Sequence, residues 1–219
     1  MAATIDSDGF QYFVGAFGSD EIADIGQILD AIPSNAAGRR WAGDNLAELL
    51  VLPAMTAVKH KLADVFPGFH ALRVVAFRKD EAANWFVPAH QDRSIPIPTQ
   101  NPPEGFTRPT HKQDGWQAEA PLGVLQSMRN FRIFVDDATE ADGPLEVIAG
   151  SHLLGRIEQA AIPGIVAQTE WWPLTGKAGD MVVLSPMLLH RSIKAKQPRG
   201  RRVLQIECLP TAAVKAFNT

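Results

Sequence analysis

The sequence holds a single cysteine, Cys208, among its 219 residues. One cysteine cannot form a disulfide within the chain and supplies no thiolate cluster for a structural zinc ion, so the sequence fits a reducing compartment. A buried, inert thiol late in a strand is the ordinary place for such a residue. No apolar run approaches the roughly 20 residues of a membrane span, and the N-terminus lacks the pattern of a signal peptide. We therefore expect a cytoplasmic protein without a membrane partner.

Excess charge of either sign is also missing. The formal net charge is −3, and the 21 lysines and arginines are scattered rather than gathered in one segment, which argues against nucleic acid as the main partner. A small-molecule partner is expected instead, and composition leaves the oligomeric state open. With 46% hydrophobic and 21% charged residues, the chain predicts one globular domain over 1–219, with a helical N-terminal part at about 1–66 and a barrel at about 70–209.

Helical periodicity is confined to the N-terminal third. Ser19 is the predicted N-cap of a helix that begins "DEIADIGQILDAI", and a second helical region is divided by Pro53. The apolar faces of these helices are predicted core rather than a site, and they consist of Ile22, Ile25, Ile28 and Leu29 in the first region and Met55, Val58, Leu62 and Val65 in the second.

From about residue 70 onward the hydrophobic pattern becomes extended. Gly, Pro, Asp and Asn separate eight β-rich runs at roughly 71–78, 84–92, 129–136, 144–148, 170–174, 181–186, 187–193 and 201–208. No helical pattern alternates with these runs, so βαβ units are disfavoured. The sequence predicts a mainly β protein with N-terminal helices, built as a jelly-roll or cupin-like barrel.

The longest irregular stretch, at 93–116, is rich in Pro and polar residues. Loops of this length within compact domains are commonly lids or binding loops. Because this one begins directly after His90 and Asp92, we expect it to cover a site at that pair.

Three residues form a candidate metal site. Side chains two apart on a strand share a face, so His90 and Asp92 in "FVPAHQD" project together while Gln91 points away. A lone His-x-Asp pair is weak evidence, but His190 in "GDMVVLSPMLLHRSI" adds a second imidazole on another β-rich run. Two imidazoles and one carboxylate match the triad that leaves three cis positions of Fe(II) open, whereas a structural zinc site is closed by four ligands.

A hydroxyl and a guanidinium follow the distal histidine. Ser192 lies on the His190 face of its run, and Arg201 stands at the entry to the last one. An arginine paired with a hydroxyl is a suitable grip for a carboxylate inside a barrel.

Several motifs in order resemble one family. "NWFVPAHQDRSI", "DGPLEVIAGSHLLGRI" and "GDMVVLSPMLLHRS" followed by "RGRRVLQIE" look like the phytanoyl-CoA dioxygenase-like family of Fe(II)- and 2-oxoglutarate-dependent oxygenases, over roughly residues 8–208. The resemblance implies a double-stranded β-helix, iron on His90, Asp92 and His190, and the distal carboxylate of 2-oxoglutarate on Ser192 and Arg201. Arg199 and Arg202 lie close enough to be alternatives to Arg201.

The resemblance also implies an activity. Such an enzyme uses O2 and 2-oxoglutarate to hydroxylate an unactivated C–H bond of a small-molecule metabolite, releasing succinate and CO2. Halogenating relatives carry a small residue in place of the carboxylate ligand, and Asp92 is retained here, so halogenation is disfavoured. The family's substrates are diverse, and neither the substrate nor the position of attack follows from the sequence.

Other polar residues have weaker assignments. Arg93, Arg132 and His111 are candidate substrate contacts: Arg93 follows the motif, Arg132 alternates with Phe134 on a strand, and His111 lies in the long loop. His152 in "AGSH" is predicted to fasten backbone rather than to bind metal, and His60 and His70 are predicted to be exposed or hydrogen-bonded.

Two other classes of function remain open at this stage. A cupin-like protein could bind metal or a small ligand without turnover, and it would not need the carboxylate grip of Ser192 and Arg201. A non-haem iron enzyme that does not use 2-oxoglutarate would turn over independently of that co-substrate.

Overall fold

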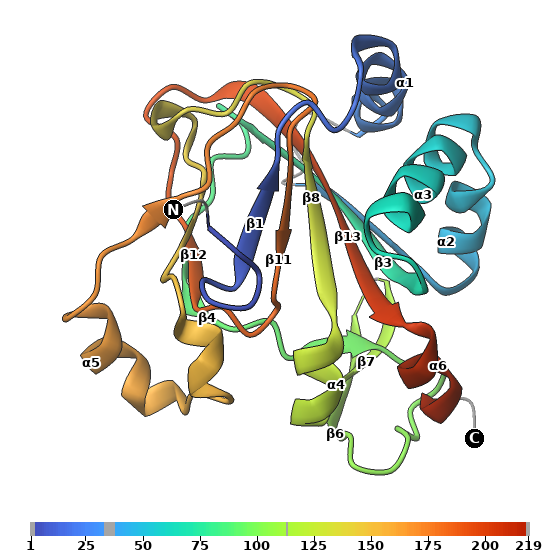
Figure 1. Cartoon of the computed structure of the whole chain (residues 1–219), viewed down its shortest axis with the longest axis vertical. Helices are drawn as coiled ribbons and strands as arrows, with labels where there is room; N and C mark the ends of the chain where they lie inside the picture. Colours follow the sequence, from blue (N-terminus) through green and yellow to red (C-terminus); the bar gives the residue numbers. More distant parts are fainter. Residues whose placement is uncertain (1–2, 33–37, 113, 218–219) are drawn as a thin grey trace.

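Two antiparallel sheets face each other in the computed structural model, which describes residues 3–32, 38–112 and 114–217 (Figure 1). The larger sheet has six strands in the order β1 (Phe10–Phe13), β11 (Met181–Leu184), β8 (Arg129–Phe134), β13 (Arg199–Pro210), β3 (Phe69–Asp80) and β2 (Gly38–Ala42). The smaller sheet has the order β10 (Trp172–Pro173), β9 (Leu145–Val147), β12 (His190–Ser192) and β4 (Val87–His90). Side chains from both sheets line one cavity between them.

The predicted fold class is confirmed, and each of the eight predicted runs contains a strand, although β4 ends at His90 rather than at residue 92. Within the described residues no strand of one facing sheet pairs with a strand of the other. The molecule is therefore a jelly roll of two opposed sheets and not a closed barrel.

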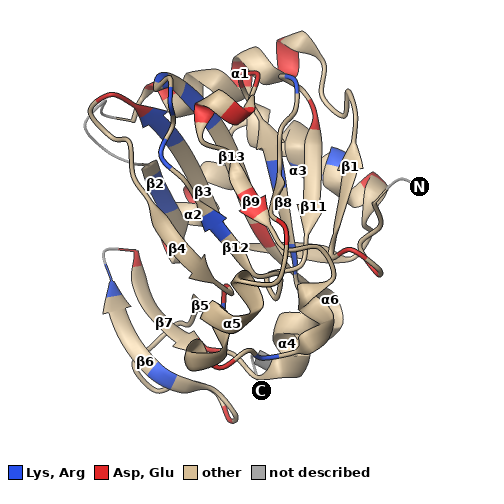
Figure 2. Cartoon of the chain, turned by 90° about the vertical axis from the view of Figure 1, so that its left-hand side faces the viewer, with Lys and Arg blue, Asp and Glu red and all other residues tan. Residues whose placement is uncertain are grey.

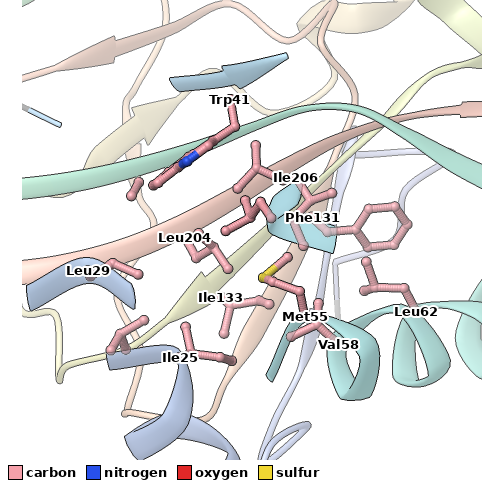
Figure 3. Packing of buried hydrophobic residues seen from close by; sticks show 14 of the residues in the cluster. Ile25, Leu29, Trp41, Met55, Val58, Leu62, Phe131, Ile133, Leu204 and Ile206 are labelled. Carbon is pink, nitrogen blue, oxygen red and sulfur yellow. The ribbon is translucent and has the colours of Figure 1, made fainter. Parts of the chain in front are cut away.

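Three helices cover the outer face of the six-stranded sheet: α1 (Ser19–Asp30), α2 (Gly43–Leu50) and α3 (Pro53–Val65) (Figure 1). Figure 3 shows helix residues such as Ile25 and Met55 packed against Phe131 and Ile206 of the strands. Alternation along β13 separates the two faces, because Leu204 and Ile206 belong to this core while Arg201, Gln205 and Glu207 line the cavity.

The helix boundaries differ from the prediction at one point. Pro53 divides the second helical region as expected and is the first residue of α3. Ser19 is not the N-cap, because it is already helical and the cap is Gly18. The Gly18 N–H donates to the Glu21 carboxylate over 2.8 Å, so an acidic side chain of the first turn satisfies the backbone N–H of the cap residue, as in one half of a capping box.

Two strands lie in the N-terminal part that was predicted to be helical. β1 pairs with β11, and β2 pairs with β3, so both extend the large sheet to its edges. Their sequences, "FQYF" and "GRRWA", are short or strongly polar, and their extended form depends on a partner strand from elsewhere in the chain.

The stretch at 93–116 is not irregular as predicted. It contributes most of a separate three-stranded sheet, in the order β5 (Ser94–Pro96), β7 (Gly115–Glu119) and β6 (Thr107–Lys112). Figure 2 shows this sheet at one end of the two facing sheets, beyond β2 and β4. We call it the lid sheet.

Short helices complete the described chain, namely α4 (Leu122–Ser127), α5 (Ile162–Val166) and α6 (Thr211–Phe217), with 3-10 turns at Glu140–Asp142, Ser151–Leu154 and Gln159–Ala161. None of the described helices has the length and apolar character needed to cross a membrane.

Candidate metal centre and its cavity

Strand pairing brings the two predicted histidine ligands together. β4 and β12 are antiparallel neighbours, and His90 stands directly opposite His190 in their register. The two imidazole centroids are 4.2 Å apart. Two residues that are far apart in the sequence therefore meet at one point of the small sheet.

Backbone carbonyl groups orient both imidazoles. His90 Nδ1 lies 2.8 Å from Pro88 O, and His190 Nδ1 lies 2.9 Å from Leu188 O. A carbonyl oxygen can only accept, so each Nδ1 carries the proton and each Nε2 presents a lone pair. Both Nε2 atoms face the same carboxylate, at 3.7 Å from Asp92 Oδ1.

The residue between the two motif positions fixes Asp92 in place. Gln91 is buried and points away from the histidines, as predicted. Its Nε2 donates to Met187 O at 2.7 Å and to Gly155 O at 2.8 Å, and its Oε1 accepts from Ile157 N at 2.9 Å. The Asp92 N–H also donates to Pro186 O at 3.0 Å, so the carboxylate is held at the end of β4 by rigid backbone.

The charge states suit cation binding. Burial opposes ionisation of Asp92, but the neighbouring His190, His90 and Arg73 outweigh it and lower the pKa of the carboxyl. Burial is the main cause of the lowered pKa of His190, so its imidazole stays neutral and keeps its lone pair. Both directions favour metal binding, because a metal ion takes an ionised carboxylate and an imidazole lone pair as ligands.

The three candidate ligand atoms lie within 4.8 Å of one another, and they form the one His, Cys, Asp and Glu cluster of this kind in the described part of the chain. Two nitrogens and one oxygen without a thiolate suit Fe(II). Side-chain exposure is 36% for His90 and 31% for Asp92 but 7% for His190, so the cluster opens to one side, where further ligands could bind.

A cavity of about 190 Å³ extends from this cluster between the two sheets. Ser192 and Arg201 line it, as predicted for a carboxylate grip. Arg201 is buried, its Nη2 donates to Gly143 O at 3.1 Å, and no residue in the described part of the chain accepts a hydrogen bond from its Nε. Arg132 also lines the cavity, and its Nε is likewise buried and unpartnered. An unpartnered buried guanidinium is costly, so these donors fit an anionic ligand.

The cavity end at Arg201 carries an excess of positive charge. Burial and the neighbouring arginine lower the pKa of Arg132 to about 9, and burial lowers the pKa of Arg201 to about 10. Both guanidinium groups remain ionised at neutral pH. Lys79 lies beside them with its side chain fully buried. A carboxylate placed here would relieve this repulsion.

The opposite end of the cavity is balanced in charge. Arg73 donates from Nε and Nη2 to the two carboxylate oxygens of Glu207, at 3.0 and 2.9 Å, and both residues are buried. Burial raises the pKa of Glu207, against the opposing effect of Arg73. Arg40, which is exposed, lines both this end and an outer groove that also includes Lys112 and Asp114, so the cavity opens there.

Sequence reasoning missed four of these residues: Arg40, Arg73, Lys79 and Glu207. A signal for three of them was present. In "LRVVAFRKD" Arg73, Val75, Phe77 and Lys79 share one face by alternation, and Glu207 shares the face of Arg201 on the last strand.

The remaining predicted residues lie in different surroundings. Arg132 faces the cavity, as its alternation with Phe134 predicted, whereas Arg93 and His111 do not line it. His111 is exposed on β6, with its ring 5.0 Å from that of Trp116. Trp85, from the stretch before His90, also lines the cavity.

The histidines predicted to have no part in metal binding lie away from the cluster. His152 contacts the Asp6 carbonyl, and His70 contacts Thr211 Oγ1. His60 is exposed on α3.

A jelly roll that holds two histidines and a carboxylate at an open cavity defines a candidate non-haem iron protein. The family follows from the sequence itself. The model of the family described as phytanoyl-CoA dioxygenase (PhyH) matches residues 6–203, and the chain belongs to this family.

Individual relatives are more distant. The L-proline trans-4-hydroxylase of Streptomyces griseoviridis is 27% identical over 186 aligned residues, covering 73% of this chain. The match spans 61% of that relative's own length. AviO1 from Streptomyces viridochromogenes Tue57 superposes with a TM-score of 0.64 at 20% identity, covering 95% of this chain and 92% of AviO1. The epimerase SnoN, solved with Fe3+, alpha ketoglutarate and nogalamycin RO, gives 0.63 at 14% identity, covering 94% and 80%.

Proposed function

We propose that this protein is an Fe(II)- and 2-oxoglutarate-dependent oxygenase that hydroxylates a C–H bond of a small molecule. The observation that carries the proposal is the arrangement inside one cavity. Three ligand atoms of the iron-binding type lie at its open side, and buried guanidinium donors without partners lie at its other end. A metal and a carboxylate-bearing co-substrate would satisfy both groups at once.

Each residue has a distinct part in this proposal. His90, Asp92 and His190 hold the metal, while Arg201 and Ser192 hold the distal carboxylate of 2-oxoglutarate. Bound iron, with O2 and 2-oxoglutarate, supplies the oxidising power for an unactivated C–H bond and leaves succinate and CO2. The two sheets exclude bulk water from the cavity, and Gln91 keeps the Asp92 carboxylate facing the imidazoles.

Relatives support the reaction class and the kind of substrate. One is an L-proline hydroxylase, and another was solved with iron and alpha ketoglutarate. Both names refer to small molecules. A small-molecule substrate would enter this cavity at the open end near Arg40. SnoN is an epimerase, so hydroxylation is the outcome that a product analysis has to establish.

The first prediction concerns the complex with metal and co-substrate. Anaerobic addition of Fe(II) and 2-oxoglutarate to the protein should give a weak visible charge-transfer band, because a 2-oxo acid would chelate iron held by His90, Asp92 and His190. The band should be absent in His90→Ala, which removes one ligand, and present in His111→Ala, which removes an exposed histidine. If the wild-type protein gives no band, the oxygenase proposal is wrong.

Two further measurements distinguish the other classes of function. A binding protein without turnover would give the band but release no succinate in air with any substrate of a metabolite panel. An iron enzyme that does not use 2-oxoglutarate would keep its turnover in Arg201→Ala, whereas an enzyme that grips the co-substrate with Arg201 should lose most of it.

A further inference from the structure

Lys79 is a fully buried lysine that lies behind Ser192 and beside Arg201, two residues that line the cavity, and does not itself line it. It stands opposite Arg201 in the register of β3 and β13. Its ammonium group donates to Ser192 Oγ at 3.0 Å, to Gly143 O at 3.2 Å and to Ile193 O. The indole of Trp85 covers it, with Nζ 4.7 Å from the ring centroid. All three ammonium protons are therefore in use, and none points to an anion in the cavity.

The contact with Ser192 determines what that hydroxyl can do. An ammonium group only donates, so Ser192 Oγ is the acceptor and its own hydrogen is free to point elsewhere. Within the described residues Ser192 Oγ has no hydrogen-bond partner other than Lys79, and Ser192 lines the cavity. Lys79 thus leaves the Ser192 hydroxyl available as a donor to the cavity that Ser192 and Arg201 both line.

The same arrangement links Lys79 to Arg201. Both side chains donate to the carbonyl oxygen of Gly143, Lys79 over 3.2 Å and Arg201 over 3.1 Å. Gly143 has a positive φ of 61°, and a Cβ there would lie 2.6 Å from the backbone nitrogen of Ala195. The shared acceptor is therefore fixed by a tight backbone packing that requires glycine.

We propose that Lys79 is a positioning residue that holds Ser192 and Arg201 as donors and so makes the cavity select 2-oxo acids that carry a second carboxylate. The proposal rests on the proposed function and adds to it the residue that sets co-substrate selectivity. Lys79 itself does not touch the ligand. Its effect reaches the ligand through the Ser192 hydroxyl, through the Gly143 carbonyl shared with Arg201, and through its charge.

The test compares two 2-oxo acids in anaerobic titrations with Fe(II). Both 2-oxoglutarate and 2-oxobutyrate can chelate the metal, but 2-oxobutyrate has no distal carboxylate. In Lys79→Met the Kd for 2-oxoglutarate should rise by at least about tenfold, the factor typical of losing support for a hydrogen bond to a charged group. The Kd for 2-oxobutyrate in this variant should stay within about twofold of its wild-type Kd. Lys194→Met, which changes an exposed lysine two residues beyond Ser192, should alter neither.

The ratio of the two affinities separates positioning from a purely structural role. If Lys79→Met lowers the affinity for both acids equally, Lys79 supports only the fold. If it lowers neither affinity, Lys79 has no role at the site. Either result overturns the proposal. Wild-type protein that binds neither acid contradicts the oxygenase proposal instead.

Ser192→Ala should show the same selective loss of 2-oxoglutarate affinity. Lys79→Met combined with Ser192→Ala should lower that affinity by less than the product of the two single effects. If the double variant instead loses 2-oxoglutarate affinity by the full product of the two single effects, Lys79 does not act through Ser192.

A pH profile gives an independent readout. Burial, Arg201 and Arg132 lower the pKa of Lys79 to about 7. A bound dianion raises that pKa, so the protonated form binds more tightly, and 2-oxoglutarate affinity should fall as pH rises above about 7. The neighbouring guanidinium groups stay ionised up to about pH 8, because the pKa is about 9 for Arg132 and about 10 for Arg201, so the fall is measured between about pH 7 and pH 8. Protonation of metal-binding side chains weakens metal binding toward low pH, which is the opposite direction. The fall should be absent in Lys79→Met. A wild-type profile flat above pH 7 contradicts the proposal.

Discussion

Arg201 differs from its two neighbouring arginines in what its side chain contacts. Arg199 forms an ion pair with Asp142 at 2.8 Å, and Arg202 donates to Asp136 and Asp30 outside the cavity. Arg201 is buried and has an unpartnered Nε at the cavity. The alternation of β13 separates Arg201, which faces the small sheet, from Arg202, which faces the helix side. Arg199 differs because the register of β13 against β3 is irregular between 199 and 201. This supports Arg201, rather than Arg199 or Arg202, as the carboxylate grip.

A substitution series should reproduce that distinction. Arg201→Gln should weaken 2-oxoglutarate by roughly tenfold to a hundredfold, because a charge-assisted hydrogen bond to the ligand is lost. Arg199→Gln, the matched control, should leave the affinity within about twofold, since it removes only a half-exposed ion pair with Asp142. Anaerobic titration of the charge-transfer band measures both. If both variants lose 2-oxoglutarate affinity equally, Arg201 is not the residue that binds the distal carboxylate.

The sequence predicted the residues whose neighbours follow from local alternation. Arg132 faces the cavity because alternation along β8 turns it there. Asp92 lies beyond the end of β4, and its place beside His90 depends on the hydrogen bonds of Gln91 rather than on strand alternation. Lys79 and Glu207 were missed because charged residues on a strand are ordinarily solvated, and only the long-range register of β3 and β13 buries them. Arg93 was predicted from its place beside the motif, but adjacency in sequence does not set direction on a turn.

At the scale of elements, the lid sheet is fastened to the large sheet through Arg73. Asp114, at the turn between β6 and β7, lies 3.9 Å from Arg73 Nη1, with both side chains less than 10% exposed. Arg73 also donates to Ser94 O at 3.4 Å. One guanidinium therefore joins the cavity wall, the lid sheet and Glu207, which places the lid next to the open end of the site.

Loosening that contact should increase the motion of the lid alone. In Asp114→Ala the amides of 107–119 should exchange with solvent at least about threefold faster, since the partly buried ion pair to Arg73 is lost. Exchange in β8 and β13 should not change. Glu104→Ala, an exposed carboxylate of the same segment, is the control. Hydrogen exchange measured by mass spectrometry tests this prediction. If the lid segment exchanges at the same rate in Asp114→Ala and in the wild type, Asp114 does not hold the lid sheet in place.

Element prediction succeeded where the amino-acid pattern alone sets the structure. The helices have apolar faces at helical spacing, and the eight runs after residue 70 are extended patterns of aliphatic and aromatic residues separated by turn-forming residues. β1, β2 and the lid strands escaped prediction because they are short or polar, as in "TRPTHK", where every residue is exposed. Such strands form only against a partner already in place, and the sequence around them does not reveal that partner.

At the scale of the whole molecule, the candidate ligands lie on the small sheet and the carboxylate grip draws on both sheets, with Ser192 from β12 and Arg201 from β13. Metal and co-substrate together would thus bridge the two layers of the jelly roll. Such binding stabilises the folded state alone, because the unfolded chain does not assemble the same set of atoms.

Thermal unfolding should report this bridge. At metal and 2-oxoglutarate concentrations about 100 times their Kd, the native state should gain about 2.7 kcal/mol from each ligand, and Tm should rise by roughly 5–10 °C for each. Ni(II) can replace iron in air to avoid oxidation. His90→Ala should lack the metal-dependent rise while keeping the ligand-free Tm within a few degrees. A rise of the same size in that variant would mean that the metal binds elsewhere.

The direct opposition of His90 and His190 has a consequence for how the chain reaches its native state. A slip of β12 against β4 by one position would turn one imidazole to the other face, so the ligand set exists only when this distant pairing is in its correct register. Pairings between residues so far apart in the chain form slowly, because a large loop has to close first. Metal uptake therefore requires that this pairing has already formed, and its rate during refolding reports the alignment of β4 with β12 rather than the initial collapse.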